Sequence, residues 1–189
     1  MKMIDEIRIE APRQHVFAAL NDPEILRQSI PGCQNLQQTS ETELTATVQA
    51  KVGPVKATFQ GAVTLSEIKA PESYTISGEG KGGAAGFAKG TARVTLIEDG
   101  NETILNYEVN AEVGGKLAQV GSRLIDGTSK KLANEFFKTF SDLVGKPKAT
   151  AENAASNTIP APAVSPPVPF LLWVEVSILA LILLFGVVA

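Results

Sequence analysis

Side chains that could carry out chemistry are few in this sequence. Its 189 residues include one histidine, His15, and one cysteine, Cys33. A metal site built from several histidines or thiolates is therefore excluded, and an internal disulfide cannot form. A Ser-His-Asp triad would have to use His15, which we expect to lie exposed on a short helix. We expect Cys33 to be a small core residue, so the sequence predicts no catalytic residues and no metal site.

A glycine-rich stretch, GEGKGGAAGFAKG at residues 78–90, is the next candidate for chemistry. Gly78, Gly80 and Gly83 match the G-x-G-x-x-G pattern of dinucleotide-binding proteins. In those proteins the motif opens a helix whose N-terminus meets the phosphates. Here a strand-like sequence follows at residues 86–98, so we predict a hairpin whose small residues let a helix approach closely.

The charges give no sign of a nucleic-acid partner. The chain has 17 basic and 20 acidic residues and a net charge of -3, without a basic stripe interleaved with aromatics. Arg123 and Asp126 could pair or contact the polar head of a ligand, or they could simply be solvated. Asp5 and Glu6 occupy the positions where a signal peptide would be apolar, so we expect the folded part to stay in the cytoplasm.

An antiparallel sheet is the element that would position these residues. Apolar and polar residues alternate at residues 44–52, 55–65, 88–97 and 103–113, with shorter signals at 6–10 and 74–76. Between the first strand and the others, residues 11–32 predict two short helices. Asp22 is expected to cap the second helix, with Pro23 at its first position.

A long helix is predicted over residues 116–144, with a length of about 44 Å. We expect it to cover the inner face of the sheet. Its predicted buried stripe runs through Leu117, Val120, Leu124, Thr128, Leu132, Phe136 and Phe140.

Small residues on the inner faces of the sheet and on the helix, including Gly121 and Gly127, predict an interior that is not completely filled. Such a cavity would be apolar and would suit a hydrophobic ligand. Tyr107 is almost the only polar group among the expected inward residues, which argues against catalysis. The expected walls of the cavity are Phe59, Phe87, Tyr107, Leu117, Val120, Gly121 and Leu124.

Composition divides the chain into a folded domain at residues 1–145, a flexible linker rich in proline and alanine at 146–169, and an apolar segment at 170–189. About 20 apolar residues suffice for a helix to cross a bilayer. We therefore predict a C-terminal single-pass anchor in the cytoplasmic membrane, with the folded domain on the cytoplasmic side. Trp173 suits the interface, and Glu175 either reaches the headgroups or contacts a partner helix. The expected anchor residues are Phe170, Trp173, Glu175 and Phe185.

Four ordered motifs resemble the CoxG family of carbon monoxide dehydrogenase subunits. They are NDPEILRQSIPGCQ at 21–34, KVGPVKATFQG at 51–61, GFAKGTARVTL at 86–96 and VGGKLAQVGSRLIDGTSKKLANEFF at 113–137. The resemblance covers nearly all of residues 1–144, and the linker and apolar tail are similar to that family as well. It implies an α+β helix-grip fold of the START-like (SRPBCC) type, in which an antiparallel meander sheet wraps around the long C-terminal helix.

The resemblance also implies a function. Family members are thought to recruit a molybdenum-dependent CO dehydrogenase, or a related molybdenum hydroxylase, to the cytoplasmic membrane and to help its electrons reach the quinone pool. We therefore expect a non-catalytic, membrane-anchored adaptor whose cavity takes a quinone or lipid. No cofactor bound covalently or through a metal is expected. The alternatives are a general carrier of hydrophobic ligands, a small START-like cyclase-type enzyme, and a docking module with a filled core.

Overall fold

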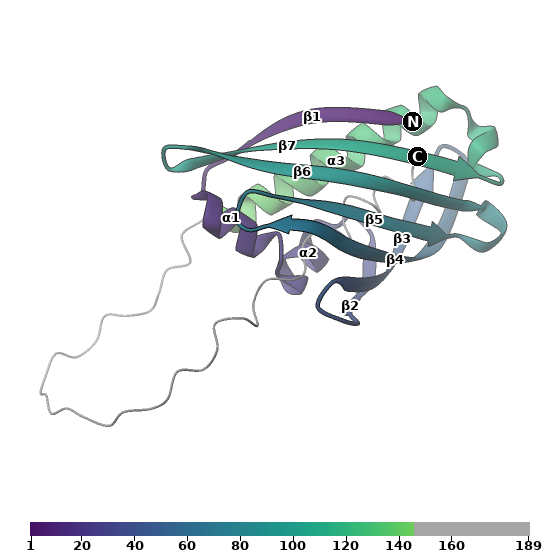
Figure 1. Cartoon of the computed structure of the whole chain (residues 1–189). Helices are drawn as coiled ribbons and strands as arrows, with labels where there is room; N and C mark the ends of the chain where they lie inside the picture. Colours follow the sequence, from purple (N-terminus) through teal and green to yellow (C-terminus); the bar gives the residue numbers. More distant parts are fainter. Residues whose placement is uncertain (146–189) are drawn as a thin grey trace, which may run out of the picture.

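The computed structural model describes residues 1–145, which form one sheet, two short helices and one long helix (Figure 1). The sheet order is β1-β7-β6-β5-β4-β3-β2, and every neighbouring pair is antiparallel. The elements are β1 (Lys2–Ile9), α1 (Arg13–Ala19), α2 (Pro23–Ser29), β2 (Cys33–Gln38), β3 (Glu43–Val52), β4 (Val55–Lys69), β5 (Ser73–Lys81), the 3₁₀ turn η1 (Gly83–Ala85), β6 (Phe87–Asp99), β7 (Glu102–Gly114), the 3₁₀ turn η2 (Leu117–Val120) and α3 (Ser122–Val144).

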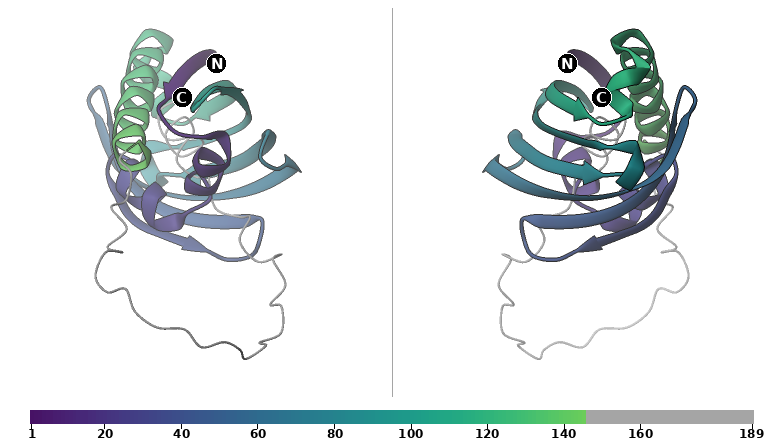
Figure 2. Two further views of the ribbon diagram at one scale, coloured as in Figure 1. Left: turned by 90° about the vertical axis from the view of Figure 1, so that its left-hand side faces the viewer. Right: turned by 90° about the vertical axis from the view of Figure 1, so that its right-hand side faces the viewer.

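The sheet curves around one side of α3, as Figure 2 shows. Its inner face is set by strict alternation: Leu44, Ala46 and Val48 of β3 are buried, while the threonines between them are partly exposed. The β3–β4 register places Val48 opposite the buried Phe59. Because alternate side chains point to opposite faces, one apolar set forms the core and the polar set faces away from α3.

The two short helices begin and end where the sequence predicts. The Asp22 Oδ1 atom accepts hydrogen bonds from the backbone N–H groups of Glu24 and Ile25, at 2.8 and 3.3 Å. This confirms Asp22 as the N-cap of α2, with Pro23 at the first helical position. Val16, Phe17 and Leu26 point inward and close one end of the core.

The long helix begins at Ser122, so the prediction of a continuous helix from residue 116 is wrong. Gly121 has a φ of 96°, which ends the short turn η2 and starts α3 in a new direction. This break moves the buried stripe, and Leu124 is 51% exposed instead of buried. The residues of α3 that are buried are Ile125, Ser129, Ala133, Phe136, Phe137, Phe140 and Val144.

The sequence patterns did not reveal β2, and they gave only the central part of β5. In β2 only Leu36 is buried, so the segment shows no apolar alternation. In β5 the inward positions beyond Ile76 are Gly78 and Gly80, which carry no side chain to reveal the period. Hydrogen bonding to neighbouring strands, rather than side-chain burial, forms these strands.

The two ends of the domain differ. At one end, which we call the distal end, lie the β3–β4 turn, the β5–β6 connection, η2 and the start of α3. At the other, the proximal end, lie α1, the β4–β5 and β6–β7 turns and Gly145, close to the Glu10 carbonyl. Because α3 runs from one end to the other, the chain beyond residue 145 starts at the proximal end.

None of the helices within residues 1–145 has the length and apolar character needed to span a bilayer. The predicted linker at 146–169 and the predicted anchor at 170–189, with Phe170, Trp173, Glu175 and Phe185, lie outside the described residues.

Candidate functional site

The interior between the sheet and α3 is lined by aromatic rings. Tyr107 of β7 stacks on Phe137, with ring centroids 5.4 Å apart. Phe136 meets Phe137 edge-on at 5.0 Å and stacks on Phe140 at 5.8 Å. These contacts suit the burial of an apolar molecule beside the rings, and they provide no polar group for bond-breaking chemistry.

Tyr107 is the one predicted cavity residue that carries a titratable group. It lies opposite Asp5 in the β1–β7 register. Burial is the main cause that raises the pKa of Tyr107, and the charge of Asp5 and a hydrogen bond to its carboxylate raise it further. The hydroxyl therefore keeps its proton across the physiological range and serves as a hydrogen-bond donor.

A second buried phenol, Tyr74 of β5, was not singled out by the sequence patterns as a candidate site residue. Its ring packs edge-on against Phe17, with centroids 5.7 Å apart, and its hydroxyl has no hydrogen-bond partner. Burial raises the pKa of Tyr74 well above its ordinary value of 10.0. The signal available in the sequence was the alternation that places Tyr74 on the same face as Ile76.

The predicted cavity residues separate into a buried group and a surface group. Phe59, Tyr107 and Leu117 are buried. Val120 is half-buried, and Gly121 is exposed. A Cβ atom on Gly53, in the β3–β4 turn, would lie 3.3 Å from a Val120 methyl carbon and 3.6 Å from one of Leu124, so the structure brings these three residues together.

Phe87 lies apart from the interior. It is 41% exposed and alternates in β6 with the buried Ala88, so it shares the outward face with Lys89. Its ring covers Gly114 on the neighbouring strand, where a Cβ would collide with it. Of the predicted wall residues, Phe87 and Leu124 are thus the two exposed apolar side chains, both at the distal end.

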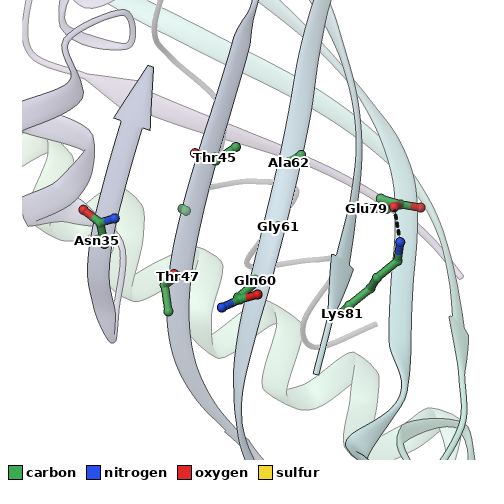
Figure 3. Close-up of a pocket in the computed structure, with 9 residues that line it drawn as sticks. Asn35, Thr45, Thr47, Gln60, Gly61, Ala62, Glu79 and Lys81 are labelled. Carbon is green, nitrogen blue, oxygen red and sulfur yellow. Dashed lines mark ion pairs between the residues drawn. The ribbon is translucent and has the colours of Figure 1, made fainter. Parts of the chain in front are cut away.

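Two surface hollows lie on the sheet face that points away from α3. The first, of about 360 Å³, has a floor of Ala46 and Gly61 (Figure 3). Outward-facing residues surround it: Asn35, Thr45, Thr47, Gln60, Ala62, Glu79 and Lys81. The second, of about 570 Å³, lies over Gly78, Gly90 and Ala111. The small inward residues therefore thin the sheet enough to hollow its outer face.

No catalytic group emerges from the described residues. His15 is exposed on α1, and Cys33 is half-buried, with its thiol pKa raised by burial. Within residues 1–145, no group of three or more histidine, cysteine or acidic side chains could hold a metal ion. The buried hydroxyls have structural partners: that of Thr103, for example, donates to the Ala11 carbonyl at 2.7 Å.

Comparison with solved structures places the fold. A conserved protein from Geobacillus kaustophilus is 30% identical, with a TM-score of 0.72, and the match covers 76% of this chain and 95% of that one. Since that protein consists almost wholly of the matched region, a domain equivalent to residues 1–145 folds on its own. No curated protein matches the chain.

More distant structures share the fold alone. A START superfamily protein from Mycobacterium smegmatis has a TM-score of 0.58 at 13% identity, covering 76% of this chain and 96% of that one. The Zhui aromatase/cyclase from a Streptomyces species has a TM-score of 0.56 at 9% identity, covering 82% and 99%. Together these identify a START-like α+β fold with a seven-stranded antiparallel sheet and a C-terminal helix within the described residues.

The family model for CoxG, a subunit of carbon monoxide dehydrogenase, matches residues 6–145. The match spans the whole sheet except the first residues of β1, the short helices and α3. The chain belongs to the CoxG family of carbon monoxide dehydrogenase subunits.

Proposed function

We propose that this protein is a non-catalytic accessory protein of a molybdenum-dependent CO dehydrogenase, or of a related molybdenum hydroxylase, and that it binds a hydrophobic molecule such as a quinone between the sheet and α3. The observation that carries the proposal is the family match over the folded domain. The aromatic interior supports it, since rings such as Phe136 and Tyr107 offer apolar surface and a single hydroxyl donor.

The path for such a ligand would lie at the distal end. There the η2 segment stands between Gly115 and Gly121, whose φ values are 76° and 96°. Leu117 closes the core from this segment, while Val120 and Leu124 meet the β3–β4 turn above it. Few backbone hydrogen bonds hold η2, so it is the cover that could move at least free-energy cost.

Residues 170–189 would hold the protein at the cytoplasmic membrane through a C-terminal helix, with the folded domain in the cytoplasm. Tethering raises the local concentration of the domain at the bilayer and at its partner enzyme. In this arrangement the redox chemistry belongs to the dehydrogenase, and the accessory protein carries the hydrophobic molecule between enzyme and membrane.

A cyclase-type enzyme is the second candidate. The fold is shared with the Zhui aromatase/cyclase, and the unpartnered hydroxyl of Tyr74 is a buried polar group of the kind that an enzyme of this fold would use. Against it, Tyr74 lies among core residues beneath α1 and not beside either hollow.

Native mass spectrometry of the full chain, extracted in mild detergent, tests the ligand. We expect an added mass equal to that of an isoprenoid quinone or lipid. Val120→Trp should narrow the path and lower the occupied fraction, whereas Ile97→Trp, on the outward face, should not. An unliganded wild-type protein, or equal occupancy in both variants, would contradict the proposal.

A pull-down tests the partner and the anchor. The full chain and a chain ending at Lys148 are each incubated with membranes and the purified dehydrogenase. We expect only the full chain to carry the enzyme into the membrane fraction. Sedimentation of the truncated protein with membranes to the same extent would rule out the C-terminal segment as the anchor.

A further inference from the structure

The distal end carries apolar side chains that no other part of the described domain covers. Leu124 is 51% exposed, and Phe87 is 41% exposed. Exposed small or apolar residues lie near them in the turns, including Pro54, Ala84 and Ala118. A cluster of this kind at the tip of a domain is typical of a surface that contacts a partner of matching chemistry.

The same end carries a ring of positive charge. Among the described residues, six cationic side chains lie there against three carboxylates. The cations are Lys51, Lys56, Lys81, Lys89, Lys116 and Arg123, and the anions are Glu79, Glu112 and Asp126. Lys81 and Lys89 are neutralised by Glu79 and Glu112, at 2.8 and 3.1 Å. Lys51 and Lys56, by contrast, face each other across the β3–β4 pair.

The two like charges are informative, because directly opposite cations repel and destabilise a strand pair. Within residues 1–145, neither Lys51 nor Lys56 is part of an ion pair. Lys116 and Arg123, on either side of η2, are likewise outside the ion pairs of the described domain. An anionic partner would relieve this repulsion, and apolar tips among unpaired cations match a bilayer with anionic headgroups.

The proximal end has the opposite charge. Its turns and strand termini carry Glu41, Glu43, Glu67, Glu72, Glu98, Asp99 and Glu102. Arg8 bridges two of these, and Arg13 bridges a third. An anionic bilayer would repel this end, so electrostatics alone would turn the domain with its distal end toward the lipid.

We infer that the distal end is a membrane-docking surface, in which Leu124 and Phe87 enter the headgroup region of an anionic bilayer while Lys51, Lys56, Lys116 and Arg123 contact lipid phosphates. This inference rests on the proposed function and deepens it, because it orients the path for the hydrophobic ligand toward the lipid.

The tether does not prevent this orientation. The chain beyond Gly145 has 44 residues, of which the last 20 are the apolar segment. α3 spans roughly 35 Å between the two ends. The 24 residues between Gly145 and the apolar segment would span about 75 Å if fully extended as polyproline, which is longer than the domain.

Vesicle co-sedimentation of residues 1–145 tests the inference without the tether. Vesicles of phosphatidylcholine with about 30% phosphatidylglycerol should bind the domain, and pure phosphatidylcholine should bind it much less. The double variant Lys116→Gln, Arg123→Gln should weaken binding about 30-fold, since each cation near an anionic surface contributes roughly five- to tenfold. The matched control, Lys69→Gln with Lys138→Gln, removes two cations away from the distal end and should leave binding unchanged.

The apolar contribution has its own matched pair. Leu124→Ser should weaken vesicle binding about tenfold. Ile97→Ser, at a side chain 47% exposed at the proximal end, should not. Circular dichroism checks that each variant is folded, and Phe87→Ser provides a second distal variant if Leu124→Ser fails to fold.

Three results would overturn the inference. They are absence of binding to anionic vesicles, equal loss in the distal and control variants, and distal variants that weaken dehydrogenase pull-down while leaving vesicle binding intact. If the domain docks on vesicles through the distal end but carries no hydrophobic ligand in mass spectrometry, the ligand proposal fails and the docking surface stands.

Discussion

The proximal and distal ends of the domain are built on different principles. At the proximal end, rings and branched chains such as Phe17, Leu26 and Phe140 are fully or almost fully buried, and Arg8 bridges Asp99 and Glu102 across the last strands. At the distal end, glycines with positive φ form the turns, and apolar side chains reach the surface. The contrast teaches that one end supplies the stability of the fold, which leaves the other end free to present groups that cost little to move.

The largest test of this contrast compares a core ring with a distal side chain. Phe140→Ala should lower the free energy of unfolding by about 3–5 kcal/mol, because it removes a ring that is fully buried and stacked on Phe136. Leu124→Ala should change it by less than about 1 kcal/mol, since half of that side chain is already in water. Urea unfolding of residues 1–145 measures both. Comparable losses would mean that the distal end also holds the fold together.

The second test compares two glycines of the distal end. Gly86 has a φ of 113°, and a Cβ there would collide with the Gly114 carbonyl oxygen. Gly121 has a φ of 96° with open space around it. Gly86→Ala should therefore lower stability by more than about 2 kcal/mol, whereas Gly121→Ala has only backbone strain, of about 1–2 kcal/mol. Thermal unfolding of the two variants ranks them, and the reverse order would show that packing around Gly86 adjusts freely.

The smallest effect concerns the two buried phenols. Tyr74→Phe should be neutral or stabilising by about 1 kcal/mol, because the hydroxyl is buried without a partner. Tyr107→Phe should lower stability by about 1 kcal/mol, because it loses the hydrogen bond to Asp5. Urea unfolding at neutral pH measures both variants. Equal losses would indicate a bound water that satisfies Tyr74.

The same pair predicts a dependence on pH. Burial raises the pKa of Tyr74 above its ordinary value of 10.0, so above about pH 10 the unfolded phenol ionises while the folded one keeps its proton. Stability should therefore be unaffected by this group below that pH and should fall as the pH rises beyond it. Tyr74→Phe should lose stability more gently than the wild type between about pH 10 and 11, measured by urea unfolding at each pH. Parallel curves would show that Tyr74 ionises without penalty.

The sequence was informative wherever side chains report the backbone geometry. Alternating residues around Val48 and Phe59 identified the sheet and its inner face, and Asp22 with Pro23 located α2. The family motifs identified the fold, which the match over residues 6–145 confirms. β2 escaped detection because Leu36 is its single buried residue. The start of α3 was misplaced because the apolar spacing before Gly121 continues through the break at that residue.

The candidate site was harder to predict than the fold. The exposure of Phe87 depends on which face of β6 its position occupies, and that of Leu124 depends on the change in direction at Gly121. Spacing along the chain contains neither fact. The segregation of charge between the two ends could have been noticed, because it follows from counting charges in alternate turns, but only once the strand order was known.

The course of α3 has a practical consequence for handling the protein. Since this helix delivers the chain to the side opposite Leu124 and Phe87, a tag or fluorophore joined after Gly145 would sit roughly 35 Å from those side chains. Immobilising the domain on a sensor through such a tag would leave its basic tip pointing into the solution. A tag at Met1 would be a poor choice, because its amino group donates to the Ala111 carbonyl in the distal half of the sheet.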